Sequence, residues 1–253
     1  YLVVGDWRQG CIITPHLVIG EGKFIKILTT SIVAAVVMAG ASAQAATYDF
    51  KAVANAGGGI GESAYTSYDT TTTFAGPGLT ITAGDVGFDG TPYVYFDNGN
   101  AGIGVCNDLN DAGDAKVNTA TNGSANLCNP SSDDGITTTG DFLTFTAPST
   151  MTIDGICINS NHDSDSIWDT VWEIAGEKYS DALDSFVDNS LSQDGDIFID
   201  LGGFLLAAGD YFTVKGTFGP NSYISGLAVT PVPLPAAGWL LIAGLGGLAA
   251  MRR

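Results

Sequence analysis

The sequence predicts an all-β fold, an antiparallel β-sandwich or jelly roll, and three observations support this prediction. Short runs of β-branched and aromatic residues alternate with polar ones, which is typical of strands that bury one face. Gly, Asp, Asn and Pro separate the runs, at a spacing of about 10 residues over much of the chain. Hydrophobic residues make up 45% of the 253 residues and charged residues only 14%, which favours a packed core over disorder.

The expected strands follow one another along the middle of the chain. They lie at residues 79–81, 93–96, 142–145, 151–153, 156–158, 167–172, 197–199, 211–214 and 223–224. One helix is expected where Ala182, Leu183, Phe186 and Val187 share a helical face. The polar stretch 107–140 is rich in Asn, Asp, Gly, Ser and Thr, and it predicts a long surface excursion.

The charge balance excludes one large class of partners. The chain has 27 acidic and 9 basic residues, a formal net charge of −18. A protein this acidic is repelled by phosphate backbones, so no nucleic-acid partner is expected. Residues 46–230, the expected folded domain, hold four lysines against 25 acidic residues, a net charge of −21. Most of these acids are Asp, which suits solvated turns.

Residues 23–45 have the pattern of a secretory signal peptide. Lys23 and Lys26 precede an apolar run at 27–38, and small residues follow up to Ala45, after which we expect cleavage. A buried core helix is the alternative for the apolar run. Residues 1–22 precede the signal, and we interpret them as an over-extended leader; a long translated n-region is the alternative.

Residues 231–253 combine a proline motif, an apolar run and a basic end. The apolar run at 237–251 would make a helix about 22 Å long, short for a membrane span of about 20 residues. The arginines behind it predict a cytoplasmic C-terminus. The prolines cannot continue a strand, so they predict an extended, accessible joint. The motif is Val232, Pro233, Leu234, Pro235 and Ala236, and the basic stop is Arg252 and Arg253.

This tail resembles the PEP-CTERM sorting signal in its VPLPA variant. The resemblance implies a Gram-negative bacterium that makes exopolysaccharide, and insertion of the tail into the inner membrane. It further implies processing near the motif by an exosortase and delivery to the cell surface or extracellular matrix. The alternative is a plain single-helix anchor, although such an anchor needs neither the Pro-x-Pro joint nor so short a helix.

Three cysteines lie in the expected domain, and export would place them in an oxidising compartment. Cys106 and Cys128 flank much of the polar excursion, so a bridge between them would stabilise the fold by about 3 kcal/mol. Cys157 alternates within an apolar strand and is expected to be a small core residue, while its pairing with either of the others is the competing arrangement. The segment around Cys106, Ala-Gly-Ile-Gly-Val-Cys, also resembles a secreted family that carries the same tail and brings no known activity.

Calcium is the one cofactor for which the sequence offers candidate ligands, at Asp163, Asp165 and Asp169, or at Asp194 and Asp196. These residues do not fit the EF-hand spacing, and solvated Asp is the alternative interpretation. The domain has a single histidine, His162, and lacks a Gly-x-Ser-x-Gly elbow, so neither a zinc site nor a hydrolase triad is indicated.

We therefore expect a non-enzymatic, cofactor-free surface or matrix protein, structural or adhesive in exopolysaccharide. Its expected partners are signal peptidase, an exosortase, the inner membrane and exopolysaccharide. Two other functions stay open: a calcium-dependent carbohydrate-binding module and a secreted hydrolase. A glycosidase would need two carboxyls that face each other across a cleft. Among 25 acids the sequence cannot single out such a pair.

Overall fold

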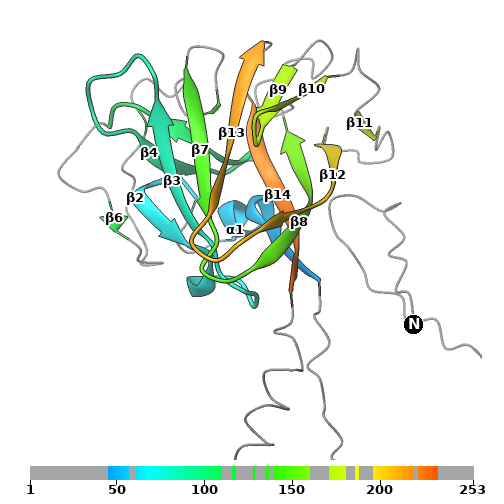
Figure 1. Cartoon of the computed structure of the whole chain (residues 1–253). Coiled ribbons are helices and arrows are strands. Elements are labelled where there is room, and N and C mark those ends of the chain that lie inside the picture. The colour runs from blue at the N-terminus through cyan, green and yellow to red at the C-terminus, as the bar shows by residue number, and fades with distance from the viewer. Residues whose placement is uncertain are drawn as a thin grey trace, which may run out of the picture.

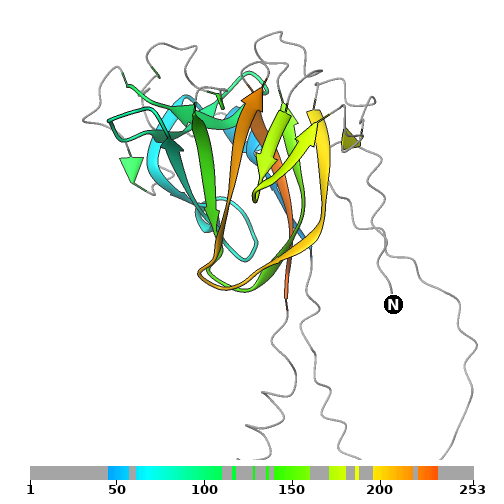
Figure 2. The same cartoon turned by 45° about the horizontal axis from the view of Figure 1, so that its top comes forward.

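The computed structural model confirms the all-β prediction. It describes residues 45–56, 61–109, 116–117, 128, 135–136, 140–159, 171–180, 186–187, 196–218 and 222–232. Within these ranges, almost all of the regular structure is antiparallel strand, wrapped around one apolar core (Figures 1 and 2). The strands expected at 93–96, 142–145, 197–199, 211–214 and 223–224 fall on observed strands, and the one expected at 79–81 overlaps a strand that begins at Thr80. The two expected at 151–153 and 156–158 are one continuous strand. Of the strand expected at 167–172, only 171–172 is described, and these two residues lie in a strand.

The described part of the chain contains fourteen strands, one α-helix and one 3-10 helix. The helices are α1 (Phe50–Asn55) and η1 (Thr70–Thr72). The strands are β1 (Ala46–Asp49), β2 (Ser63–Asp69), β3 (Thr80–Asp85), β4 (Tyr93–Asp97), β5 (Gly102–Cys106), β6 (Lys116–Val117), β7 (Asp141–Thr146), β8 (Met151–Asn159), β9 (Val171–Ile174), β10 (Glu177–Ser180), β11 (Phe186–Val187), β12 (Asp196–Leu206), β13 (Tyr211–Phe218) and β14 (Tyr223–Pro231).

The strands form two layers that share β2. Neighbouring strands follow the order β10-β9-β13-β7-β3-β2-β4-β5-β14-β8-β12-β11, while β1 pairs with β14 and β6 pairs with β2. The first half of β2 belongs to one layer, because Tyr65 lies opposite Val94 of β4. The second half belongs to the other, because Tyr68 lies opposite Ile81 of β3. β2 therefore joins the two layers along one side of the core.

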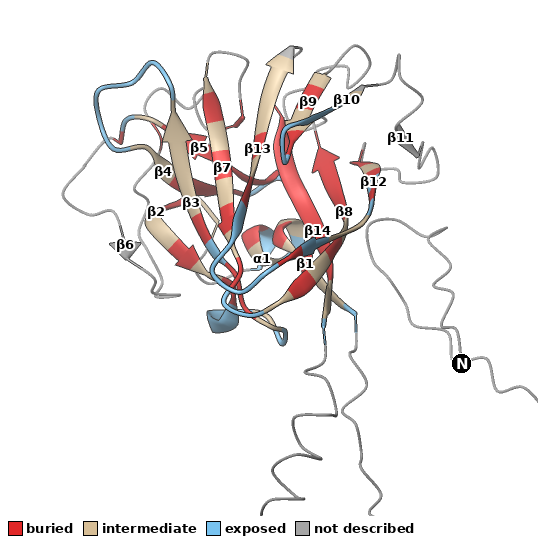
Figure 3. Ribbon diagram, in the orientation of Figure 1, coloured by how far each residue is buried: buried red, intermediate tan, exposed pale blue. Residues whose placement is uncertain are grey.

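The core lies between the layers and is rich in aromatic side chains. Burial along β7 alternates, so Leu143 and Phe145 point inward while Phe142 and Thr144 are half-buried, as expected for a sheet with one covered face (Figure 3). Trp172 in β9 is buried and packs in the core. Trp168 lies outside the described residues.

The helix expected around Ala182 and Phe186 is wrong at the positions that the structure describes. Phe186 and Val187 form β11 and pair with Ile199 and Phe198 of β12. The open edge of β12 offers backbone hydrogen bonds there, and such tertiary pairing outweighs a weak local helical pattern. Ala182 itself lies outside the described residues.

The α1 helix is an element that the sequence pattern missed. It is six residues long, too short for a helical period to show. Asp49 caps it by accepting a hydrogen bond from the Ala52 N–H at 2.8 Å. Phe50 and Ala54 are buried against the sandwich, so packing rather than propensity stabilises this single turn and a half.

The stretch 107–140 was expected to be a surface excursion, but its described residues make several contacts with the domain. Lys116–Val117 pairs in parallel with β2, and Leu109 makes an isolated bridge with Cys128. Ile136 is buried and bridges Ser222, just before β14. The mostly polar composition of the stretch hid these contacts, because a few apolar residues suffice to attach a long loop to a sheet.

The described chain enters and leaves the sandwich at the same end. β1 follows directly from Ala45 and pairs with the second half of β14, with Ala46 opposite Val229. After β14, the Val232 N–H donates to the Thr150 carbonyl at 3.1 Å. Figure 1 shows the two strands side by side at their outer ends. Within the described residues, no helix is long and apolar enough to cross a membrane; the apolar run 237–251 lies outside them.

Candidate functional site

The structure describes only some of the residues that the sequence singled out. Cys106, Cys128 and Val232 are described, and Val232 is 39% exposed where the chain leaves the domain. The other sorting-motif and basic-stop residues lie outside the described ranges: Pro233, Leu234, Pro235, Ala236, Arg252 and Arg253. So do the calcium candidates Asp163, Asp165 and Asp169.

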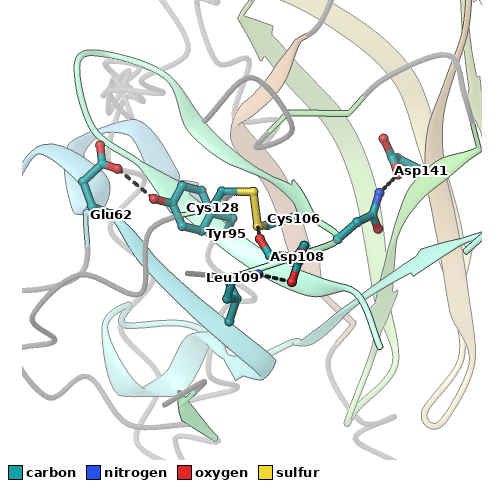
Figure 4. The surroundings of a disulfide bond; sticks show 8 residues. Glu62, Tyr95, Cys106, Asp108, Leu109, Cys128 and Asp141 are labelled. Carbon is teal, nitrogen blue, oxygen red and sulfur yellow. Dashed lines mark hydrogen bonds between the residues drawn. A yellow bond between two sulfur atoms is a disulfide. The ribbon is translucent and has the colours of Figure 1, made fainter. Parts of the chain in front are cut away.

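Cys106 and Cys128 form the expected disulfide. Their Cα atoms lie 5.7 Å apart, and 22 positions separate them in the chain (Figure 4). Cys106 ends β5, and Cys128 is placed by its backbone bridge to Leu109. The bond therefore ties the loop that follows β5 back onto the end of that strand.

Cys157 differs from the expectation in part. It is buried in β8, as a small core residue should be, and it is not bonded to either of the other two cysteines. Its sulfur is nevertheless disulfide-bonded. The expectation of a simple packing residue is therefore right about its burial and wrong about its thiol.

A small apolar cluster surrounds the Cys106–Cys128 bond, separate from the main core. We call it the staple cluster; its members are Ala64, Tyr95, Cys106, Leu109 and Cys128. All five are at most 5% exposed. The disulfide and Leu109 thus cover Ala64 and Tyr95, on β2 and β4, and bury a surface that the main core leaves outside.

The Tyr95 hydroxyl is the polar group at the edge of this cluster. It donates to Oε2 of Glu62 at 2.7 Å (Figure 4). Burial is the main cause that raises the pKa of Tyr95, and the bond and the negative charge of Glu62 raise it further. Tyr95 therefore stays protonated at any physiological pH. It acts as a hydrogen-bond donor here and cannot serve as a general base.

A second polar pair lies close to the staple cluster. The Asn107 side-chain amide donates to Oδ1 of Asp141 at 3.1 Å. Asp141 is fully buried at the start of β7. This bond joins the residue after β5 to a strand of the other layer, and it keeps a buried carboxylate hydrogen-bonded.

An ion pair joins α1 to the start of β12. Lys51 Nζ lies 2.7 Å from Oδ2 of Asp196, the first residue of β12, and the two side chains are 16% and 5% exposed. Burial raises the pKa of Asp196, while the hydrogen bond and charge of Lys51 oppose the rise. Hydrogen bonds from Ser225 and Asn159 oppose it further. Lys51 therefore helps to keep a buried carboxylate ionised.

Three asparagines continue this polar network toward the β4–β5 turn. Asn55 donates through Nδ2 to Oδ1 of Asn100 at 2.9 Å, and the Asn100 N–H donates to Oδ1 of Asn55 at 3.2 Å. Asn159 donates to the Asn100 carbonyl at 2.7 Å. Asn100 has a positive φ of 73°, a conformation that Asn tolerates well. None of these contacts could be read from spacing, because the partners lie 45 and 59 positions apart.

The polar groups described above link strands and loops of the domain to one another. They are bonded to one another across strands, and no three His, Cys, Asp or Glu side chains gather in the described part of the chain to hold a metal ion. The exit of the chain at Val232 is different, because its exposed side chain precedes the proline joint directly. It is the feature that connects the fold to the predicted sorting tail.

No protein-family model matches the chain, and comparisons with curated proteins and with solved structures likewise find no match.

Proposed function

We propose that this chain is an exported protein of the bacterial cell surface or extracellular matrix. Its C-terminal tail directs it to an exosortase, and the β-sandwich is the part that is delivered. The observation that carries the proposal is the order of the tail: the Val-Pro-Leu-Pro-Ala motif, a short apolar run and two arginines. The signal-peptide pattern at 23–45 supports export independently.

The position of the two flanking segments supports the same proposal. β1 starts at Ala46, the first residue after the predicted cleavage point. β14 ends at Pro231, the residue directly before the motif. The motif therefore starts where strand pairing stops, and Pro233 and Pro235 disfavour continuation of the strand. A processing enzyme needs an extended, accessible segment, and this is where the chain offers one.

For the sandwich itself we propose a structural or adhesive role in exopolysaccharide. Its net charge of −21 over residues 46–230 favours a hydrated, non-aggregating component of a matrix. A disulfide, a buried ion pair and an asparagine network all hold loops and α1 to the sheets. Such cross-links suit a protein that must stay folded outside the cell, where no chaperone refolds it.

Intact-mass measurement in two hosts tests the sorting proposal. The whole chain is expressed in a Gram-negative host with an exosortase and in an otherwise identical host without it. We expect the first host to release a form that has lost both flanking segments. We expect the second to hold a membrane-bound form that has lost only its signal peptide. One mass in both hosts, in the same fraction, contradicts the proposal.

A further inference from the structure

The end of the sandwich where the chain enters and leaves differs in charge from the opposite end. Three loops lie at this terminal end: residues 70–79, 147–150 and 207–210. Register places them together, because Thr80, Thr146 and Tyr211 are neighbours across β3, β7 and β13. Asp210 is the one ionisable residue in the three loops. Asp69, the last residue of β2, lies opposite Thr80 at this end, and Asp154 accepts a hydrogen bond from Thr230 near the exit. In a domain with 25 acids, this end thus carries few of them.

More of the acids in the described loops and strand ends lie at the opposite end. β3 and β7 finish there with Asp85 opposite Asp141. Asp89 follows in the loop before β4, and Asp108 follows β5. The sandwich is therefore polarised along its strands, with the described acidic loops far from the two termini.

The terminal end also exposes apolar side chains. Leu205 and Tyr211 are each 65% exposed, on either side of the β12–β13 loop, and Val232 is 39% exposed at the exit. Ala207, Ala208 and other small residues of the loops are exposed between them (Figure 3). A tyrosine beside aliphatic residues is the composition that prefers the boundary between water and lipid.

The tail sets how far this end can lie from a bilayer. Only residues 233–236 separate Val232 from the apolar run 237–251. Five fully extended steps span about 18 Å, and a proline joint is no longer than this. β14 has nine residues, about 30 Å, so the acidic end lies beyond the reach of the headgroups when the domain stands upright.

We propose that the terminal end of the sandwich rests on the phospholipid surface while the tail is inserted, with Leu205, Tyr211 and Val232 at the headgroup boundary. This inference rests on the proposed function, because it needs an inserted tail. The short tether brings the end to the membrane, and its small number of charges lets it stay there. The acidic end is repelled by anionic headgroups, and this repulsion selects the upright orientation.

Two added tryptophans test this orientation in the full chain, each measured as a difference from the emission of the native tryptophans that remain. Trp239→Phe removes the tail tryptophan from the background, and Tyr211→Trp or Phe88→Trp then adds a probe at the terminal or the acidic end. Each protein is reconstituted in phosphatidylcholine–phosphatidylglycerol vesicles with brominated acyl chains. We expect the lipid to quench added emission from position 211 and to leave that from position 88 unchanged. Equal quenching at both positions, or quenching at position 88 alone, overturns the proposal.

A charge variant and flotation complete the design. Leu205→Asp in the Tyr211→Trp background should reduce the quenching, whereas the matched control Val86→Asp at the acidic end should not. The alternative is that a second copy of the chain covers this end. Emission from position 211 that changes with protein dilution and not with bromination of the lipid would show this, and it would overturn the proposal. Flotation with the vesicles separates the two failures: a chain that does not float refutes insertion of the tail itself, whereas a floating chain without quenching refutes only the docking.

Discussion

Ala46 lies opposite Val229 in the antiparallel ladder between β1 and β14, so the entrance and exit of the described domain are hydrogen-bonded neighbours. Both predicted processing points thus lie at one end of the molecule, just outside paired strands. Removal of either flanking segment leaves every strand of the core in place. The same pairing means that β1 itself is part of the fold rather than part of the leader.

This relationship predicts a sharp N-terminal boundary for the stable domain. A chain of residues 46–232 should unfold at the same denaturant concentration as the same chain extended to residue 23. A chain that starts at Phe50 lacks β1 and the fully buried Tyr48, and we expect it to lose more than about 3 kcal/mol. Urea denaturation followed by tryptophan emission measures both, and equal midpoints for the 46–232 and 50–232 chains contradict the prediction.

Removal of the staple disulfide should destabilise the domain without unfolding its main core. The double variant Cys106→Ala and Cys128→Ala should lose about 3 kcal/mol, because a loop with a separation of 22 gains freedom in the unfolded chain. Ser149→Ala, in an exposed turn of the terminal end, serves as the control and should behave as the parent. A loss under about 1 kcal/mol in the double variant would show that the bond contributes little.

Gly102 should be among the least replaceable residues of β5. Its φ of +132° suits glycine, and a Cβ there would lie 2.4 Å from the Ile224 carbonyl oxygen. Gly102→Ala should therefore cost at least about 3 kcal/mol, from strain plus displaced backbone. Gly209 also has a positive φ but open space around it, so Gly209→Ala should cost about 1 kcal/mol. Equal costs for the two variants would contradict a clash at β14.

The buried Asp196 predicts a specific pH dependence. Its folded-state pKa is raised, so the stability that it contributes is fully present below its unfolded pKa of about 3.9 and declines as pH rises through the folded value. We therefore expect the free energy of unfolding of the parent, minus that of Asp196→Asn, to fall as the pH is raised from about 3 to neutrality. The decline should begin near the unfolded pKa of about 3.9. Denaturant titrations across this range measure it, and a difference that grows with pH contradicts the assignment.

The lysine partner gives a companion test at neutral pH. Lys51→Met keeps most of the side-chain length but leaves the Asp196 carboxylate without its cation. Breaking one side of a buried pair costs about 3 kcal/mol. The double variant Lys51→Met and Asp196→Asn should recover part of this loss, and a strictly additive double variant would show that the two residues do not act as a pair.

The sequence predicted the fold class because alternation and turn residues are local signals. Leu143 and Phe145 alternate with polar neighbours, and that period needs no knowledge of their partners. Phe186 was misassigned because a two-residue edge strand is decided by β12, which offers a free edge. The α1 helix was missed because six residues are shorter than the pattern that identifies a helix.

The contacts of the site could be predicted from the sequence only where a residue has few possible partners. With three cysteines in the expected domain, Cys106–Cys128 was one of a few possible pairs, and loop closure favoured it. Asp196 was one of 25 acids, and its pairing with Lys51 spans 145 positions, so only the fold could select it. The small number of charges at the terminal end was likewise invisible, because the three loops that form it are far apart in the chain.

Replacement of the motif prolines tests whether the tail is a sorting signal that an exosortase cuts. Pro233→Ala with Pro235→Ala is compared with Pro77→Ala plus Pro148→Ala, two loop prolines at the same end of the sandwich, in a host that carries an exosortase. The measurement is the intact mass of the protein in membrane and extracellular fractions. We predict that the motif variant accumulates as a membrane-bound species that retains its tail, while the control is processed like the parent. Processing of the motif variant to the parental mass, at the parental yield, would contradict the account.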